Sequence, residues 1–491
     1  MTAKASVQPN LLDEIVRKRR TQLARDCRNR RIYNIQDELS AGRREKRDFV
    51  AALRNARRPA VIAELKRASP SRGRIRESFP VAELARAYER GGATAISVLT
   101  EEEHFEGRLE YLEQARAATT LPILRKDFIF RPFQVWESAA AGADAILLIA
   151  AMLDKVAMGK LIQQARKADL ATLCEVHNRQ ELELALAMEP DCIGVNHRDL
   201  RTFQVDLKLG EELGPLLPDA VVKVAESGLR TPADLARMAS SGFDAFLIGE
   251  SFMRAPDPGA ALETLLAGCE MPLVKICGIT NRGDAVHACA AGAGAVGFVF
   301  APSPREVTPE AVRAMVPFLS AEVQRVGVFA GAPITEIARI ADLCGLHAVQ
   351  LHGRYSPGEG QILAKQVSVW RAVSMPEEIE AARAWAEVAE RFVLDHMQPD
   401  GISGGSGASF AWELAPVFAR RLAEHVPAGQ RLPEISVAGG LTPANVVEAL
   451  RLSGARGVDV CSGVEQRPGA KDPAAIAAFC RQTRRVFWSR A

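Results

Sequence analysis

Two short segments each place reactive side chains at the end of a β-rich run. The first, AELKRASPSRG at 63–73, carries Glu64 and Lys66, which lie two residues apart and therefore point to the same face of a strand. The second, VKICGIT at 274–280, carries the thiol of Cys277 beside a glycine that exposes backbone N–H groups. Each segment opens its own series of alternating strands and helices, which indicates two reaction sites on one chain.

Further polar residues of the first half also follow β-rich runs. A carboxylate beside an ammonium group stays charged, whereas burial pushes the pKa of an isolated neighbour toward neutral pH. Lysines and glutamates around one opening therefore suit general acid–base catalysis on a carbonyl or an enamine. Any one of them alone is more often part of a surface salt bridge, but their convergence favours a site. The candidates are Glu64, Lys66, Lys126, Glu175, Asn196, Arg198, Glu226 and Ser227.

The second half offers Cys277 and Asp395 at the ends of its first and sixth β-rich runs. Backbone donors or a cation such as Lys275 lower the pKa of a thiol, so the pair suits proton transfer across a sugar carbon, with the aspartate as the acid. The alternative for Cys277 is a buried packing thiol. His352 and His396 lack ligand spacing with any cysteine, so the sequence predicts no metal site.

Glycine-rich loops recur after the seventh and eighth β-rich runs of both halves. Glycine exposes backbone N–H groups there, and the N-terminus of a following helix would complete a phosphate cradle. One such loop is weak evidence, but the recurrence predicts two phosphate-bearing substrates. The loops are ESG at 226–228, IGES at 248–251, AGGLTP at 438–443 and CSGVE at 461–465. A further loop, GISGGSG at 401–407, is expected to be a mobile active-site segment.

Eight β-rich runs occur in each half of the chain, separated by amphipathic stretches with helical spacing. Their apolarity is continuous, which is typical of strands covered on both faces in a parallel sheet. Eight strand–helix units in roughly 210 residues favour a closed barrel over an open sheet. The sequence therefore predicts an α/β fold of two tandem (β/α)8 TIM barrels. The expected domains are 1–268, of which 1–58 is an N-terminal helical extension, and 269–491.

Composition places the chain among ordinary globular proteins of two or more domains. Its 491 residues are 48% hydrophobic and 25% charged, with a net charge of +2. Nine cysteines without a CxxC pair fit a reducing cytoplasm better than a disulfide framework. The first residues contain no apolar core of signal-peptide length. We therefore expect a cytoplasmic protein.

Two segments raise other classes of function, and both have simpler explanations. The basic clusters at 17–20 and 28–31 are interrupted by acidic residues and have no aromatic series, which favours a solvated helical extension over nucleic-acid binding. Residues 285–304 contain no Asp, Glu, Lys or Arg, but their glycines and prolines favour a helix end, a turn and a buried strand over a membrane span. We expect no nucleic acid, membrane or obligate protein partner.

Several long motifs resemble two enzyme families of tryptophan biosynthesis. Residues from about 8 to 268 are similar to indole-3-glycerol-phosphate synthase, through the motifs AELKRASPSRG, SVLTEEEHFEG, LRKDFI, CEVH, GVNHRDL, AESGL and LIGESFM. Residues 272 to 491 are similar to phosphoribosylanthranilate isomerase, through the motifs KICGIT, FVFAPSPREV, VQLHG, VLD, GGSG, AGGLTPANV and GVDVCSGVE. The whole chain resembles the fused bifunctional enzyme.

The resemblance implies that the first barrel closes the indole ring of a carboxyphenylamino-deoxyribulose phosphate, with loss of carbon dioxide and water and without a metal or organic cofactor. Its catalytic residues would be Glu64, Lys66, Lys126, Glu175, Asn196 and Glu226. Lys126 would be the general acid on the sugar carbonyl, and Glu175 would act in the dehydration. Arg198 would meet the anthranilate carboxylate. The phosphate would be held by Ser69, Ser227, Gly228 and Gly249.

The second barrel, by the same resemblance, would catalyse the Amadori rearrangement of N-(5-phosphoribosyl)anthranilate. Asp395 would protonate the ring oxygen and Cys277 would remove the C2 proton. Arg305 would bind the carboxylate, a group that its planar guanidinium matches. Further substrate contacts would come from His352, Gly405, Gly439, Gly440, Ser462 and Gly463. The isomerase product is the synthase substrate, so the two halves would perform consecutive steps on phosphorylated anthranilate–ribose compounds.

Three positions depart from the family pattern. His197 stands where a second asparagine is usual, and Cys461 stands where serine is common. The loop APSPREV, which carries Arg305, is one residue shorter than the commonest form.

Two alternatives follow from the same residues. A pair of phosphate-binding barrels from histidine biosynthesis would be expected to use aspartates at the ends of strands one and five. This chain has Glu64 or Cys277 at the first position and Glu175 or Ser374 at the other, which disfavours that assignment. In the second alternative, one barrel has lost its activity and serves as a scaffold or binding partner.

Overall fold

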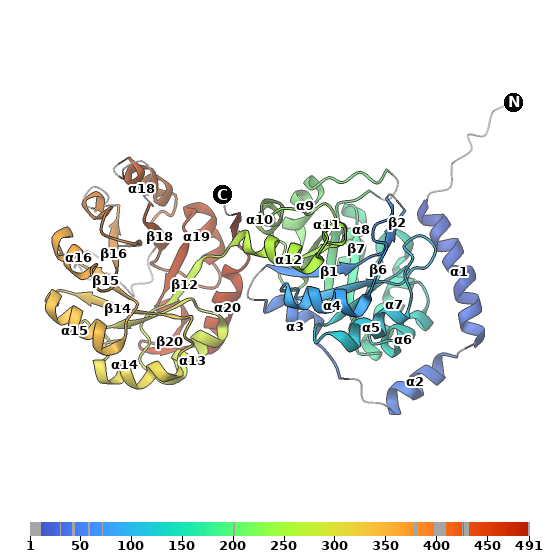
Figure 1. Ribbon diagram of the computed structural model, residues 1–491, viewed down its shortest axis with the longest axis horizontal. Helices are drawn as coiled ribbons and strands as arrows, with labels where there is room; N and C mark the ends of the chain where they lie inside the picture. The colour runs from blue at the N-terminus through green and yellow to red at the C-terminus, as the bar shows by residue number, and fades with distance from the viewer. Residues whose placement is uncertain are drawn as a thin grey trace. The chain divides into compact units, whose positions relative to one another are not determined.

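The structure is a computed structural model, and it describes residues 11–29, 31–41, 45–56, 59–70, 72–199, 202–376, 382–396, 409–424, 426 and 432–489. The chain forms two compact units, one of Met1–Glu270 with Trp488–Ala491 and the other of Met271–Phe487. Each unit is built around a closed barrel of strands enclosed by helices (Figure 1).

The first barrel has eight parallel strands, each paired with the next along the chain, and the last pairs with the first. They are β1 (Ala60–Leu65), β4 (Ala95–Leu99), β5 (Ile123–Lys126), β6 (Ala145–Ile149), β7 (Ala171–Val176), β8 (Cys192–Asn196), β9 (Val222–Glu226) and β10 (Ala245–Ile248). Short pairs flank the barrel: β2 (Ala68–Ser69) with β3 (Gly73–Arg74), and β11 (Cys269–Glu270) with β22 (Trp488–Ser489).

The helices of the first unit are α1 (Leu11–Asn29), α2 (Ile32–Ala41), α3 (Phe49–Arg54), α4 (Val81–Arg90), α5 (Glu110–Ala118), α6 (Pro132–Ala140), α7 (Lys155–Lys167), α8 (Arg179–Leu186), α9 (Lys208–Leu213), α10 (Pro232–Ser240), α11 (Glu250–Arg254) and α12 (Pro258–Ala267). Polar residues at several N-termini explain where these helices begin. The side chains of Asp154, Asn178 and Thr231 each accept a hydrogen bond from a backbone N–H in the first turn of the helix that follows.

The second barrel repeats this topology with β12 (Leu273–Ile276), β13 (Ala295–Val299), β14 (Gln324–Ala330), β15 (Ala348–His352), β16 (Ser368–Met375), β17 (Arg391–His396), β18 (Glu434–Val437) and β19 (Gly457–Val460). Its described helices include α13 (Arg282–Ala291), α14 (Pro309–Met315), α15 (Ile334–Cys344), α16 (Pro357–Leu363), α18 (Leu414–Ala423), α19 (Val446–Ser453) and α20 (Pro473–Thr483). A small hairpin, β20 (Glu465–Arg467) with β21 (Ala470–Lys471), follows a short 3-10 turn, Ser462–Val464.

Two tandem closed barrels confirm the fold class that the sequence predicts, and each β-rich run is a barrel strand. Most strands of the first barrel are buried along their whole length, as continuous apolarity indicates. All the barrel strands are parallel, so their carboxyl ends meet at one rim of each barrel. The reactive residues singled out above lie at or just after those ends.

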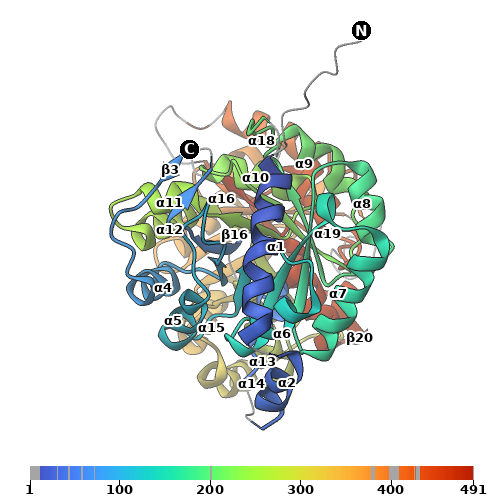
Figure 2. The same cartoon turned by 90° about the vertical axis from the view of Figure 1, so that its right-hand side faces the viewer.

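The N-terminal extension differs from the expected solvated helix, because α1 packs on the first barrel. In Figure 2 α1 crosses in front of that barrel. Leu12 and Ile15 of α1 belong to the same buried cluster as the apolar interior of the strands, and so do Phe49 and Leu53 of α3. The cluster of basic residues is therefore split: Arg17 and Arg20 are exposed, but Arg19 is buried. The basic residues of this segment indicated a solvated helix, but its apolar residues Leu12 and Ile15 form a face that packs on the barrel.

Residues 285–304 form the end of α13, a left-handed turn at Gly292 and the buried strand β13, as the sequence predicts. Within the described part of the chain, no helix has both the length and the apolarity needed to cross a bilayer.

Candidate active sites

Lys126 lies at the centre of the first site. It is the last residue of β5, and its Nζ atom lies 3.0 Å from Glu175 Oε2 on β7 and 2.7 Å from Glu226 Oε2 on β9. Both glutamates are buried. Three strands that are distant in sequence thus bring one ammonium and two carboxylates into direct contact, as expected from their common place at strand ends.

Burial and charge push the pKa values of these groups apart. Burial would lower the pKa of Lys126, but Glu175, Glu226 and Glu64 outweigh it and raise the pKa above its ordinary value. Burial acts to raise the pKa of Glu175, yet Lys126 and His177 hold it well below its usual range. Burial raises the pKa of Glu226 to about 7, with Glu175 adding to the effect and Lys126 opposing it. One carboxyl group is therefore fixed as an anion while the other titrates near neutrality.

His177 was not singled out from the sequence, although it follows the strand of Glu175 directly. Its Nε2 atom lies 3.3 Å from Glu175 Oε1, and its Nδ1 atom lies 3.0 Å from Glu181 Oε2. Burial acts to lower the pKa of this imidazole, but the two carboxylates raise it to about 10. A protonated His177 therefore keeps Glu175 ionised.

Glu64 and Lys66 form a second ion pair at the cavity wall, with Lys66 Nζ 2.5 Å from Glu64 Oε1. The cavity has a volume of about 510 Å³ and lies within the first barrel unit. The cavity wall includes all eleven residues that the sequence assigns to the synthase half: Glu64, Lys66, Ser69, Lys126, Glu175, Asn196, Arg198, Glu226, Ser227, Gly228 and Gly249.

One end of the cavity combines a left-handed backbone turn with buried hydroxyl groups. Ser227 and Gly228 have φ values of 68° and 82°, a left-handed turn that is favourable for glycine and unusual for serine. The hydroxyl groups of Ser69 and Ser251 are buried at the wall and have no hydrogen-bond partner in the described part of the chain. Ser251 was missed, although it stands two residues after Gly249 in the same loop.

Three arginines surround Glu250 at this end. Arg198 Nη2 lies 3.4 Å from Glu250 Oε2, and Arg72 Nε and Arg254 Nε lie 3.4 and 3.3 Å from Oε1. The local positive charge therefore exceeds the negative charge, which favours a phosphate or carboxylate group. The sequence singled out Arg198 but missed Arg72 and Arg254, which only the fold brings together. Asn196 accepts a hydrogen bond from the backbone N–H of Arg198.

Helix α1 contributes to the same cavity, which the sequence did not predict. Leu12 and Ile15 line the cavity. Arg19 donates two hydrogen bonds to Asp127, from Nε to Oδ1 at 3.2 Å and from Nη2 to Oδ2 at 2.9 Å. Asp127 directly follows Lys126, so α1 is attached to the strand that carries the proposed acid.

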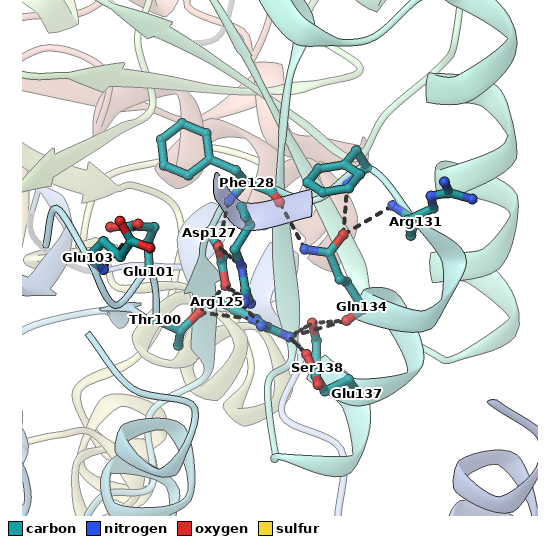
Figure 3. Close-up of polar contacts among 12 residues, drawn as sticks. Thr100, Glu101, Glu103, Arg125, Asp127, Phe128, Arg131, Gln134, Glu137 and Ser138 are labelled. Atoms are coloured by element: carbon teal, nitrogen blue, oxygen red, sulfur yellow. Dashed lines mark hydrogen bonds and ion pairs between the residues drawn. The ribbon is translucent and has the colours of Figure 1, made fainter. Parts of the chain in front are cut away.

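A buried network holds Asp127 in place (Figure 3). Arg125 is fully buried and donates from Nη2 to Asp127 Oδ2 at 2.9 Å, and Thr100 donates to the same oxygen at 2.6 Å. The other side of the Arg125 guanidinium bonds to Glu137 and Ser138 on α6. Burial would raise the pKa of Asp127, but Arg19 and Arg125 lower it to about 2.

The second barrel carries a buried lysine beneath Cys277. Lys275 on β12 donates from Nζ to Asp459 Oδ2 at 2.7 Å and to Gln350 Oε1 at 2.9 Å. Cys277 lies two residues further on, at the rim, and so points to the same side of the strand. Asp459 was not a candidate from the sequence, although it stands two residues before Cys461 in GVDVCSG and so points to the same side of the strand.

The pKa of Cys277 is lowered and the pKa of Asp395 is raised, so both groups titrate near neutral pH. A hydrogen bond from the Cys461 thiol, together with the charge of Lys275, lowers the pKa of Cys277 to about 7 against the opposing effect of burial. Burial raises the pKa of Asp395 to about 6, with Asp459 adding to the effect and the His396 backbone N–H opposing it. A thiolate and a carboxylic acid can therefore coexist near neutral pH.

Arg305 reaches the same rim but is already paired within the protein. Its Nε and Nη2 atoms donate to the two carboxylate oxygens of Glu465 at 2.9 and 2.8 Å. Lys471 Nζ also lies 2.9 Å from Glu465 Oε1. Arg305 lies beside Gly278 and pairs with Glu465, while neither Glu465 nor Lys471 was a candidate from the sequence.

The glycine loops of the second barrel contain backbone conformations that only glycine adopts easily. Gly439 and Gly440 have φ values of 76° and 61°. A Cβ atom on Gly463 would lie 1.8 Å from the carbonyl oxygen of Leu441, so only glycine fits there. Ser462 begins the 3-10 turn that contains Gly463.

His352 ends β15, and its Nε2 atom lies 2.7 Å from the side-chain nitrogen of Gln350. Burial, aided by nearby Lys275, lowers its pKa to about 3, so the imidazole is neutral. Gly405 and the rest of GISGGSG lie outside the described residues.

His197, the first departure from the family pattern, packs as a structural residue. Its Nδ1 atom lies 3.0 Å from the backbone oxygen of Ser227, and its ring contacts Phe243 edge-on. Burial lowers its pKa, so it is neutral. Among the described residues, no three His, Cys, Asp or Glu side chains converge in a way that could hold a metal ion.

Comparisons with known proteins identify the family of each half of the chain. The family model "Indole-3-glycerol phosphate synthase" matches residues 12–265, and "N-(5'phosphoribosyl)anthranilate (PRA) isomerase" matches residues 274–482. The Tryptophan biosynthesis protein TrpCF of Yersinia pestis is 36% identical over 482 residues, which cover 96% of this chain and 94% of that protein. Neither the family models nor this full-length relative supports the alternative in which one barrel is an inactive scaffold.

Two further relatives match one half each. The indole-3-glycerol phosphate synthase of Burkholderia vietnamiensis is 47% identical over 52% of this chain and 97% of its own length. A solved phosphoribosyl anthranilate isomerase, in complex with reduced 1-(o-carboxyphenylamino)-1-deoxyribulose 5-phosphate, is 35% identical over 43% of this chain and 98% of its own, with a TM-score of 0.37. The chain therefore belongs to the TrpCF family of bifunctional tryptophan biosynthesis enzymes, with an indole-3-glycerol phosphate synthase barrel followed by a phosphoribosylanthranilate isomerase barrel.

Proposed function

We propose that Lys126 is the general acid of the synthase reaction, with Glu175 and Glu226 as the carboxylates that act with it. The observation that carries this assignment is the contact of one ammonium with two buried carboxylates at the cavity wall. Lys126 stays protonated at neutral pH, so it can donate a hydrogen bond or a proton to a sugar carbonyl oxygen as negative charge develops there.

The two glutamates take different parts because their pKa values differ. Glu226, with a pKa of about 7, can accept and return a proton at neutral pH, and it can reprotonate Lys126 after each transfer. Glu175 remains ionised and stabilises positive charge that develops as water leaves. Glu64 holds Lys66 at the cavity wall, where the ammonium and Asn196 orient the intermediate.

The substrate's two anionic groups have separate places in this proposal. The phosphate lies against Ser69, Ser227, Gly228 and Gly249, and we add the unpartnered hydroxyl of Ser251 to this set. Arg198 faces the anthranilate carboxylate. The reaction closes the indole ring of the carboxyphenylamino-deoxyribulose phosphate and releases carbon dioxide and water without help from a metal or an organic cofactor.

In the second barrel, Cys277 is the base that removes the C2 proton of N-(5-phosphoribosyl)anthranilate, and Asp395 is the acid that protonates the ring oxygen. Their pKa values of about 7 and 6 support this division, since between pH 6 and 7 a minor part of the molecules carries the thiolate and the carboxylic acid together. Arg305 binds the carboxylate after exchanging part of its pairing with Glu465. Further substrate contacts come from His352, Gly405, Gly439, Gly440, Ser462 and Gly463.

The proposed domains are 1–268, with its extension 1–58, and 269–491. The family matches at 12–265 and 274–482 support these limits. We further propose that the enzyme works in the cytoplasm, on small phosphorylated anthranilate–ribose compounds, without a nucleic acid, a membrane or an obligate protein partner.

The test of the first assignment is Lys126→Met, which keeps the length of the side chain and removes its charge. Loss of a general acid is expected to lower synthase kcat by about 100-fold or more, while isomerase kcat stays the same. Asp144→Asn, a change at a buried carboxylate that pairs with Arg116 outside the cavity, serves as a control for general destabilisation. A folded Lys126→Met protein with undiminished ring closure would remove Lys126 from this role.

A further inference from the structure

Cys277 and Cys461 are neighbours on adjacent parallel strands at the rim of the second barrel. Strand β12 pairs with β19 in the register Lys275 to Asp459 and Ile276 to Val460. The next backbone bond, from Cys277 N to Val460 O at 2.8 Å, continues the ladder. The two cysteines are therefore the next pair in register, with their side chains on the same face.

The geometry of this pair suits a disulfide bond. Neighbouring strands lie about 4.8 Å apart, and the Cα atoms of disulfide-bonded cysteines are usually about 4.4 to 6.8 Å apart. The two thiols are close enough that each shifts the pKa of the other. A Cβ atom on Gly278 would lie 2.9 Å from Cys461 Sγ, so this glycine leaves the room that the second sulfur occupies. Both thiols are free in this structure.

The chemistry of the surroundings also favours oxidation. Lys275 lies beneath Cys277 and favours the thiolate form of that sulfur. Lys471 Nζ lies 3.7 Å from Cys461 Sγ, but Cys277 and burial raise the pKa of Cys461, so Cys461 stays a thiol while Cys277 is the nucleophile. Cys277 is 8% exposed at a rim that substrate must reach, whereas Cys174 and Cys480 are buried thiols whose pKa values burial raises to about 12 and 11. A reactive thiolate beside a second cysteine is the usual arrangement at a redox-sensitive site.

We propose that Cys277 and Cys461 form a reversible oxidation site, at which a hydroperoxide converts the two thiols into a disulfide that stops the isomerase reaction. The Cys277 thiolate attacks the peroxide, the O–O bond breaks, and the products are a sulfenic acid and hydroxide. Cys461 then attacks that sulfur and displaces the hydroxyl group, which leaves as water. In total, two thiols are oxidised by two electrons and one hydrogen peroxide is reduced to two waters.

The consequence for activity rests on the proposed role of Cys277 as the base, whereas formation of the disulfide does not. A sulfur held in a disulfide cannot accept the C2 proton, so oxidation is expected to lower isomerase kcat by about 100-fold or more. The synthase residues lie on the other barrel, and synthase activity therefore serves as an internal control in the same molecule.

The experiment treats the full-length protein with hydrogen peroxide and measures both activities and the tryptic peptides, before and after dithiothreitol. The expected product is a peptide of residues 276–282 linked to one of residues 457–471, together with loss of isomerase activity that dithiothreitol restores. Cys461→Ser should form no such link, and its Cys277 should oxidise further to a form that dithiothreitol does not restore. Cys289→Ser, which removes a half-buried thiol of α13, is the matched control and should behave like the wild type.

Two results would overturn the site: no linked peptide at a peroxide concentration that stops the isomerase, or recovery of Cys461→Ser with dithiothreitol to the wild-type extent. A linked peptide with full isomerase activity would instead support the disulfide and refute the role of Cys277 as the base.

Discussion

Arg19 is expected to fasten helix α1 over the synthase cavity, and its removal tests how far the extension serves substrate binding. The perturbation is Arg19→Met, which keeps an apolar stem and removes the guanidinium. Both partners of the ion pair are buried, with side-chain exposures of 5% for Arg19 and 0% for Asp127. Breaking such a pair generally costs about 3 to 5 kcal/mol. Asp127 keeps its bonds from Arg125 and Thr100, which brings the expected cost to the lower end, about 3 kcal/mol.

That loss falls on the attachment of α1, because Arg19 lies on this helix. About 3 kcal/mol corresponds to roughly two powers of ten in the docking equilibrium. Leu12 and Ile15 would then cover the cavity for a smaller fraction of the time, so synthase KM should rise by up to about 100-fold while kcat falls less. Isomerase kinetics should not change.

The assay combines synthase kinetics with hydrogen exchange of the α1 backbone amides, whose protection should fall together with the affinity for substrate. Arg17→Met is the matched control, since Arg17 lies on the same helix and is exposed. A folded Arg19→Met protein with unchanged α1 protection and unchanged synthase KM would refute the reasoning.

The remaining predictions concern one backbone position and one pH profile. A Cβ atom on Gly249 would lie 2.5 Å from Glu64 Oε1, so Gly249→Ala should displace that carboxylate and lower synthase kcat by about 10- to 100-fold. Unaltered kcat would show that the position of Glu64 is not critical. For the isomerase, kcat/KM should be greatest between about pH 6 and 7, because Asp395 loses its proton with a pKa of about 6 and Cys277 with a pKa of about 7. The residual activity of Asp395→Asn should instead rise through pH 7 and level off, and a falling alkaline limb in that variant would contradict the assignment.

The sequence predicts the barrels well because their signals are local. Continuous apolar runs and helical spacing recur once per unit, and polar residues at the ends of parallel strands must meet at one rim. This is why Lys126, Glu175 and Glu226 could be placed together without knowledge of the loops.

The parts that the sequence did not predict depend on contacts between distant segments. In the sequence, Arg19 resembles any other basic residue of a solvated helix. Only the folded structure brings it to its partner Asp127. Arg72 and Arg254 become part of an anion site only because Glu250 stands between them. Asp459 and Cys461 are the exception, since strand alternation alone places both on the inner face with Lys275 and Cys277.

The most direct test of two complete and separate sites is complementation between two inactivated enzymes. Lys126→Met should convert N-(5-phosphoribosyl)anthranilate only as far as the carboxyphenylamino-deoxyribulose phosphate, and Cys277→Ser should not form that intermediate at an appreciable rate. A mixture of the two proteins should produce indole-3-glycerol phosphate, because each supplies the step that the other lacks. A mixture that still produces none, from two folded proteins, would contradict the assignment of one reaction to each barrel.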